Sequence, residues 1–348
     1  GITRGSTGNP GELFRFSRRG DALSRGPMSA DFQILLYYLY TRIPDPGAYA
    51  AAHQEWCEEL GLRGRILIAG EGINGTVSGL REATEAYCAG MAADPLTAGM
   101  EFKKDPAQRH AFPKLSVKVR PEVVSLSLED DFSPQETTGT YLSPQEWREM
   151  MGRDDVVLLD ARNDYEWELG RFEGAMLPDV ESFRELPEWI DRHRDDLEGK
   201  KILTYCTGGI RCEKFSGFLR RRGFPEVYQL HGGIVTYGKD PEVQGEKFEG
   251  KCYVFDDRVG VEVNRSGDAR VVSCCQVCGE PWDVYRNCAW SPCNRQYFCC
   301  ERCYGGERRF CGSACREAAI VSHAAEGNDE AAKRTRGERK QERKLQNA

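Results

Sequence analysis

The positions of apolar residues divide the chain into two successive regions that mix helices and strands. Between residues 31 and 120 they predict, in order, a strand, a helix, two strands, a helix and closing strands at 101–103 and 115–119. The first strand is the apolar run at 32–40, and the first helix has apolar side chains on one side over 46–60. The Asn74-Gly75 pair predicts the turn between the two middle strands. This order of elements is typical of a ferredoxin-like α+β domain.

A second α/β region follows at 141–248, after a polar linker at 121–140. It contains three apolar runs without polar interruption, at 156–159, 202–205 and 227–230. Such runs are typical of a parallel sheet that helices cover on both faces. Ligands of these sheets bind at the carboxyl ends of the strands. Since Asp160 and Cys206 directly follow two of the runs, we expect a functional site there.

Three segments flank these regions. Residues 249–318 form a cysteine-rich module, and residues 319–348 form a highly charged tail. Residues 1–30 are rich in Gly, Arg and Ser, and we expect them to be a disordered or non-native leader. A trimmed organelle transit peptide at 1–27 is the alternative.

Composition narrows the class of protein. No apolar run reaches the roughly 18 residues of a membrane span. The net charge of −7 disfavours an indiscriminate nucleic-acid binder, although it permits a local basic face. Clustered Cys-x-x-Cys pairs without a secretory signal peptide indicate metal ligands rather than disulfides. We therefore expect a cytoplasmic protein, or an organellar one if the transit alternative holds.

The loop after the 202–205 run has the character of a sulfur-handling site. It consists of Cys206, Thr207, Gly208, Gly209, Ile210 and Arg211. The two glycines allow inward-facing amides, a helix begins near Arg211, and the guanidinium adds positive charge. All three effects favour the thiolate, so we expect a lowered pKa for Cys206. Only four residues separate Cys206 from Arg211, whereas cysteine phosphatases have five, and the smaller loop suits a single sulfur better than a phosphate.

The neighbours of this loop permit two interpretations each. Asp160 and Arg162 have the spacing of a structural ion pair and helix cap, or they support the site. Cys212 either packs in the helix or acts as a resolving thiol for an oxidised Cys206. Glu213 and Lys214 either support the loop or contact the substrate.

The cysteine-rich module predicts two structural zinc ions. Eight cysteines occur as four successive pairs: Cys275 with Cys278, Cys288 with Cys293, Cys300 with Cys303, and Cys311 with Cys315. Four thiolates close a tetrahedral zinc site, so no open catalytic position is expected. A cross-braced arrangement would join the first and third pairs on one ion and the second and fourth on the other. Cys274 and Cys299 remain as possible substitutes in either set.

Several motifs in the same order resemble the tRNA uridine hydroxylase family of rhodanese-like proteins. They are the Cys206–Lys214 segment, the Leu159–Glu166 segment, the turn Glu71–Gly75 and the late cysteine-rich module. The resemblance covers residues 32–318 and implies a rhodanese domain at 141–248. It implies hydroxylation of uridine 34 in the tRNA anticodon loop, with molecular oxygen as co-substrate and Cys206 acting as a thiolate or persulfide. No nucleotide cofactor motif is visible. Gly170-Arg171-Phe172 departs from the usual Gly-His-Ile or Gly-His-Phe, so local packing must differ there.

Two other functions remain open. A rhodanese-type sulfurtransferase acting on a small thiol or cyanide would use the same Cys206. A zinc-dependent RNA- or protein-binding module would have an inactive rhodanese domain. Two basic stretches permit RNA contact, although ordinary solvated surface explains either one alone. The first contains Lys103, Lys104, Arg109, Lys114, Lys118 and Arg120, and the second contains Arg286, Arg295, Arg302, Arg308 and Arg309. The sequence does not fix the oligomeric state.

Overall fold

The computed structural model describes residues 31–267, 269–293, 295–305 and 309–322. The expected leader at 1–30 and the charged tail from 323 onward lie outside these residues. Contacts divide the chain into two compact units, with the boundary between Arg270 and Val271. Among the described residues, no helix is both long and apolar enough to cross a membrane.

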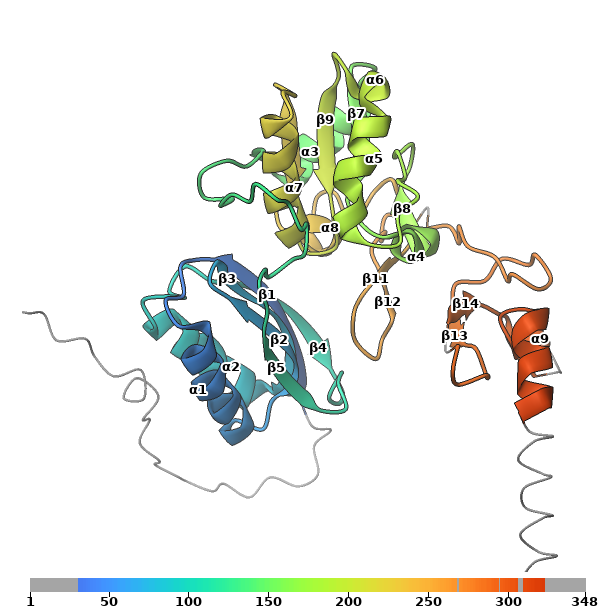
Figure 1. Ribbon diagram of the computed structural model, residues 1–348, viewed down its shortest axis with the longest axis horizontal. Helices are drawn as coiled ribbons and strands as arrows, with labels where there is room; N and C mark the ends of the chain where they lie inside the picture. The colour runs from blue at the N-terminus through green and yellow to red at the C-terminus, as the bar shows by residue number, and fades with distance from the viewer. Residues whose placement is uncertain (1–30, 268, 294, 306–308, 323–348) are drawn as a thin grey trace, which may run out of the picture. The chain divides into compact units, whose positions relative to one another are not determined.

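The first domain has the predicted ferredoxin-like topology, and strands are present at both predicted closing segments, 101–103 and 115–119. Its elements are β1 (Phe32–Tyr40), α1 (Pro46–Glu59), β2 (Arg63–Ala69), β3 (Gly72–Leu80), α2 (Arg81–Ala93), β4 (Glu101–Ala107) and β5 (Leu115–Val119). The sheet order is β4-β1-β3-β2-β5, and the first four strands are antiparallel to their neighbours. Strand β5 extends this sheet by pairing parallel with β2. Helices α1 and α2 cover one face of the sheet and leave the other open (Figure 1).

The Asn74-Gly75 turn prediction is wrong. The chain reverses at Gly70 and Glu71, and both predicted turn residues lie inside β3, where they pair with β2. A Cβ atom on Gly75 would lie 2.4 Å from the ring of Tyr37 on β1. Gly75 therefore allows close packing between strands, and a tertiary contact rather than turn geometry explains the glycine.

The second domain is built on a parallel sheet of order β6-β10-β9-β7. Its elements are β6 (Thr140–Leu142), α3 (Pro144–Met151), β7 (Val156–Asp160), α4 (Asp164–Leu169), β8 (Gly170–Phe172), η2 (Phe183–Glu185), α5 (Leu186–Arg192), α6 (Arg194–Leu197), β9 (Lys201–Tyr205), α7 (Ile210–Arg221), β10 (Val227–Leu230) and α8 (Gly233–Lys239). The three predicted apolar strands are confirmed as β7, β9 and β10. Adjacent residues Ile202 and Leu203 of β9 belong to different apolar clusters, so both sheet faces are buried.

The expected linker is a packed part of the structure rather than a solvated connector. Val123 and Leu126 are each 1% exposed. Val123 packs with Tyr40 and Ala69 of the first domain, while Leu126 belongs to an apolar cluster of the second. These residues anchor the segment to both domains.

Residues 249–270 lie with the first compact unit, although the sequence assigned them to the cysteine-rich module. Strand β11 (Phe248–Tyr253) pairs antiparallel with β8 and with β12 (Gly260–Glu262). Phe248 and Phe172 stack edge to face at 5.2 Å between ring centroids. The pairing covers a strand edge that would otherwise be open. Arg171, where the resemblance predicted altered packing, donates a hydrogen bond to the Trp167 carbonyl.

The second unit has little secondary structure. A short hairpin joins β13 (Tyr285–Asn287) to β14 (Gln296–Phe298), and α9 (Glu301–Tyr304) follows. Its buried cluster consists mainly of cysteines together with Tyr297. Residues 313–322 are helical, so the start of the expected tail is ordered, and Ala319 is 5% exposed. So small an apolar core is typical of domains that need metal for stability.

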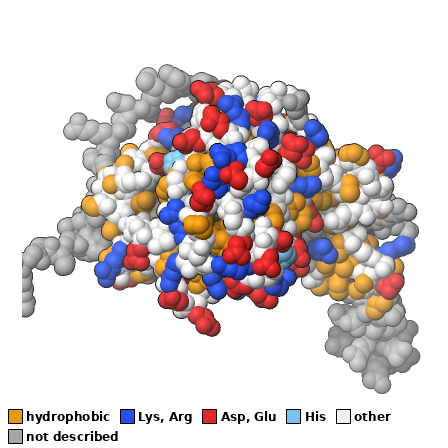
Figure 2. Space-filling model, turned by 90° about the horizontal axis from the view of Figure 1, so that it is seen from above, with side chains coloured by type: hydrophobic (Ala, Val, Ile, Leu, Met, Phe, Trp, Pro, Cys, Tyr) orange, Lys and Arg blue, Asp and Glu red, His pale blue; other side chains and the backbone are white. Residues whose placement is uncertain are grey.

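Charged side chains of both signs are interspersed over the face of the molecule seen in Figure 2. The pattern on that face agrees with the modest net charge of −7. Any basic surface for a nucleic acid must therefore be local.

Candidate active site and metal sites

Cys206 lies where β9 ends, in the loop that leads into α7. Its side chain is fully buried, and its Sγ accepts a hydrogen bond of 3.2 Å from the backbone N–H of Gly209. Gly209 has φ of 103°, a conformation that favours glycine, and this turn directs the N–H toward the sulfur. The loop thus holds the sulfur against a backbone donor at the start of a helix, as the sequence predicted.

The surroundings of Cys206 favour its thiolate. Burial would raise the pKa of the thiol. The Cys212 side chain, the Arg211 guanidinium and the backbone amides of Cys212 and Gly209 outweigh burial and lower the pKa to about 6. In contrast, burial and the neighbouring Cys206 charge raise the pKa of Cys212 well above its usual value. At neutral pH the pair therefore holds one thiolate and one neutral thiol.

Glu166 fixes the orientation of Arg211. Its two carboxylate oxygens accept hydrogen bonds of 2.5 and 2.8 Å from the Arg211 guanidinium, and it also accepts one from Thr207 at 3.3 Å. Burial raises the pKa of this carboxyl, but the Arg211 charge and hydrogen bonds lower it by more. Sequence reasoning did not select Glu166. Its signals in the sequence are its place at the end of the Leu159–Glu166 segment and the capping box that it forms with Asn163 at the start of α4.

Asp160 and Arg162 form a fully buried ion pair beneath the site. The Arg162 guanidinium donates to both carboxylate oxygens of Asp160, at 2.6 and 2.9 Å, and to the Gly170 carbonyl at 2.7 Å. Neither residue lines the cavity described below. Their geometry matches the structural interpretation, since the pair joins the ends of β7 and α4 to β8.

Glu213 connects α7 to the first domain and to the linker. Its carboxylate accepts hydrogen bonds from the hydroxyl groups of Tyr38 at 2.9 Å, Tyr141 at 2.6 Å and Thr138 at 3.3 Å. Tyr38 belongs to β1, whereas the other two precede or begin the second domain. Glu213 thus holds the start of α7, and with it the Cys206 loop, against β1 and the residues around the linker.

Lys214 makes a second connection from the same helix turn. Its side chain is fully buried, and its Nζ lies 3.0 Å from Glu71, 3.1 Å from Glu122 and 3.1 Å from Asp131. Glu71 belongs to the β2–β3 turn, and the other two belong to the linker. The contacts of Glu213 and Lys214 agree with the interpretation of loop support.

A cavity of about 390 Å³ opens in front of the Cys206 loop, between the open face of the first sheet and the second domain. The first domain contributes Leu36, Tyr38, Arg65, Leu67, Asn74, Gly75 and Thr76, the linker contributes Val123, Val124 and Ser125, and the remaining lining residues are Asn163, Tyr165, Ser182, Phe183, Cys206, Thr207, Gly208, Ile210, Arg211 and Phe255. Aromatic rings at Tyr38, Tyr165 and Phe255 are suited to stack on a planar ring. Cys206 therefore lies at the wall of this cavity, while its side chain also packs in a buried apolar cluster of the second domain.

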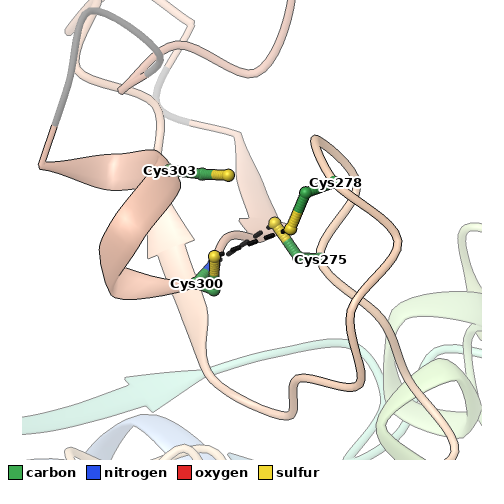
Figure 3. A group of neighbouring side chains, drawn as sticks. All are labelled: Cys275, Cys278, Cys300 and Cys303. Carbon is green, nitrogen blue, oxygen red and sulfur yellow. Dashed lines mark hydrogen bonds between the residues drawn. The ribbon is translucent and has the colours of Figure 1, made fainter.

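The eight predicted metal ligands lie in two groups of four. Cys275, Cys278, Cys300 and Cys303 form one group (Figure 3), and Cys288, Cys293, Cys311 and Cys315 form the other. In each group all sulfur atoms lie within 4.8 Å of one another. These are the two sets that the cross-braced arrangement predicts.

The sulfur spacing fits a tetrahedral metal site. Cys278 and Cys300 have their sulfurs 3.7 Å apart, and the Cys293–Cys311 and Cys311–Cys315 distances are 3.6 and 3.5 Å. Four thiolates bound at 2.3 Å to one ion would lie about 3.8 Å apart. Cys274 and Cys299 belong to neither group among the described residues. Both clusters could therefore hold a metal ion.

Comparison with known proteins matches this architecture. The family model "UPF0176 acylphosphatase like domain" matches residues 32–123, "Rhodanese-like domain" matches 143–240, and "Rhodanase C-terminal" matches 249–316. A protein of Bacillus mycoides named "tRNA uridine(34) hydroxylase" is 55% identical over 285 residues, which are 82% of this chain and 89% of that protein. One of the same name from Bacillus licheniformis is 54% identical over 289 residues, 83% of this chain and 89% of its own. The chain belongs to the tRNA uridine(34) hydroxylase family.

Proposed function

We propose that this chain hydroxylates C5 of the wobble uridine of tRNA, giving 5-hydroxyuridine, with the Cys206 sulfur as nucleophile. The observation that carries the proposal is the Cys206 thiolate at the wall of a cavity that lies between two domains and has four aromatic side chains among its lining residues. The names of the relatives give the substrate and the position. A reaction on a nucleobase in such a cavity requires the nucleotide to leave the base stack. In an anticodon loop the nucleotide is already unpaired.

The sulfur gives a route to an otherwise unreactive carbon. Addition of the sulfur to C6 of uracil moves an electron pair toward C5, which then reacts with molecular oxygen to form a C5 hydroperoxide. Two thiol equivalents reduce the O–O bond to the alcohol and water and become a disulfide. Loss of the C5 proton then breaks the S–C6 bond and restores both the ring and Cys206. The sum is uridine, O₂ and two thiols giving 5-hydroxyuridine, water and one disulfide.

Burial of Cys206 affects which sulfur reacts. A persulfide on Cys206 would carry its terminal sulfur one S–S bond further into the cavity, toward the substrate. The amides and guanidinium that stabilise the thiolate would stabilise the terminal sulfur of a persulfide equally. Arg211 would hold the negative charge, and Glu166 would keep Arg211 in place.

The metal in both cysteine clusters is, on this proposal, zinc. All four ligands of each cluster come from thiols, which leaves no open position for catalysis and assigns zinc a structural role. Cytoplasmic tRNA would be the natural substrate pool. A sulfurtransferase remains the second candidate, because the four-residue spacing between Cys206 and Arg211 equally suits transfer of a single sulfur.

Nucleoside analysis tests the proposal. Cells lacking the gene are complemented with the wild-type chain, Cys206→Ala or Cys88→Ala, and their digested tRNA is examined for 5-hydroxyuridine. The wild-type and Cys88→Ala chains should restore the nucleoside, since Cys88 lies in α2 away from the cavity. A Cys206→Ala chain that restores it would refute the role of this sulfur. Purified enzyme under ¹⁸O₂ should place the label in the product, whereas a sulfurtransferase would convert thiosulfate and cyanide and leave tRNA unchanged.

A further inference from the structure

The basic stretch predicted at 103–120 is divided between opposite edges of the first sheet. Lys103 and Lys104 lie on β4, where the Lys103 ammonium is 5.2 Å from the centre of the Tyr38 ring and Lys104 pairs with Glu85 at 2.8 Å. Lys118 and its neighbours lie on or beside β5, at the opposite edge of the same five-stranded sheet. The two halves therefore cannot form one surface.

The β5 half gains two arginines from the adjacent strand β2. Side chains alternate across a strand, so residues of even number in β5 share a face, as do residues of odd number in β2. Ile66 and Ile68 of β2 pack toward the helices. Five basic residues lie on the opposite, open face of the sheet or at the ends of these two strands: Arg63, Arg65, Lys114, Lys118 and Arg120.

Within the described residues these five cations have no acidic partner. Among the residues that the structure describes, none of them forms an ion pair, whereas Arg81 pairs with Asp31 and Arg153 with Asp155. Arg63 and Arg120 donate only to backbone carbonyls. This edge of the sheet thus has an uncompensated positive charge in a chain that is acidic overall.

The cations line a groove that adjoins the Cys206 cavity. The groove has a volume of about 450 Å³ and includes Arg65, Lys114, Lys118 and Arg120, but no Asp or Glu. It shares Arg65 and Leu67 with the wall of the cavity. The groove and the cavity therefore lie side by side on the open face of this sheet.

We propose that this groove, formed by β2 and β5, binds the sugar–phosphate backbone of the RNA strand whose uridine occupies the Cys206 cavity. The inference rests on the proposed function and identifies where its substrate is held. A base that enters the cavity leaves its own phosphates at the mouth, so the adjoining surface must accept a polyanion. Successive open-face side chains along β5 are about 6.6 Å apart, a step comparable with that between phosphates of an extended strand. Lys and Arg contacts there hold the strand without reading its sequence.

Binding of a labelled anticodon stem-loop RNA to the full chain tests this surface. The variant is Lys118→Ala/Arg120→Ala, and the matched control is Lys104→Ala/Arg153→Ala, which removes two cations that already have acidic partners. Each lost single-strand phosphate contact lowers the log–log salt slope by about 0.7 and weakens binding about fivefold at 0.1 M salt. The groove variant should therefore bind about 25-fold more weakly, with a slope smaller by about 1.4. The same loss should appear with a stem-loop of unrelated loop sequence.

A small haloacetamide reports whether the variant is folded at the site. The labelling rate of Cys206 in the groove variant should equal that of the wild type, because neither substituted residue lines the cavity. Equal RNA affinities for the groove variant and the control would overturn the inference, even if the wild type hydroxylates tRNA. Loss of affinity in the groove variant together with normal hydroxylation by Cys206→Ala would instead overturn the proposed function and leave the RNA groove standing. Absence of RNA binding by the wild type would overturn both.

Discussion

Replacement of Lys214 by Met should loosen the attachment of the first domain and linker to α7. The substitution keeps an unbranched side chain of similar length but removes the charge that three carboxylates share. Nζ lies within 3.1 Å of all three, and the exposed fractions of the Glu71, Glu122 and Asp131 side chains are 18, 17 and 44%. Two carboxylates would thus be left largely buried without their cation.

The expected loss of stability is about 3 kcal/mol. Removing one partner of a buried ion pair costs about 3–5 kcal/mol, and the lower end applies because water reaches Asp131. For a unit of this size each kcal/mol lowers Tm by about 2–4 °C, so the transition of the first unit should fall by about 6–12 °C. Hydroxylation should also slow, since Glu122 precedes the linker residues Val123 to Ser125 that line the cavity.

Thermal unfolding followed by calorimetry measures the effect, with Lys201→Met as the matched control. Lys201 pairs with Asp155 at 2.9 Å, but its side chain is 22% exposed and its partner 45%, so solvent screens the pair and its removal should cost much less stability. If Lys214→Met lowers Tm no more than Lys201→Met does, the three-carboxylate contact does not hold the domains together, and the reasoning is refuted.

Three further outcomes are expected. The rate of Cys206 alkylation, followed by peptide mass spectrometry, should rise with a midpoint near pH 6 and level off above pH 7, and a midpoint above pH 8 would contradict the lowered pKa. Because this pKa is lowered on folding, the stability it contributes should be complete above the pKa of the unfolded thiol and be lost as pH falls through about 6. Arg211→Met should raise the pH midpoint of Cys206 alkylation and lower Tm, because it leaves Glu166 buried without a cation. Arg211→Lys retains a positive charge and should therefore change the midpoint and Tm by less. Metal analysis should give about two zinc ions per chain and about one in Cys303→Ser; unchanged zinc content in that variant would contradict the assigned ligand set.

Features encoded in short stretches of sequence were predictable. The three apolar strands and the Cys206 loop follow from residues that are adjacent in the chain, and the paired cysteines follow from their spacing. The roles of four other residues were not predictable, because each pattern agrees with either role until its partner is known. These residues are Asp160, Arg162, Glu213 and Lys214. Their contacts in the structure favour a structural role for each.

Long-range partners explain what the sequence analysis missed. Glu166 lies 45 residues before Arg211, and nothing near either residue indicates their pairing. Gly75 has a turn-like neighbour but is required by a ring on another strand. The linker looked polar because its few apolar residues, such as Val123 and Leu126, have no regular spacing.

The first turn of α7 has a consequence for how the gene can vary. Four consecutive residues, from Arg211 to Lys214, meet four different neighbours: Glu166, the Cys206 sulfur, the tyrosine hydroxyls and the three carboxylates. Each residue of an α-helix is rotated by about 100° from the one before it. Insertion or deletion of a single codon here would turn all four side chains away from their partners at once. This segment should therefore accept conservative replacements singly but no change in length.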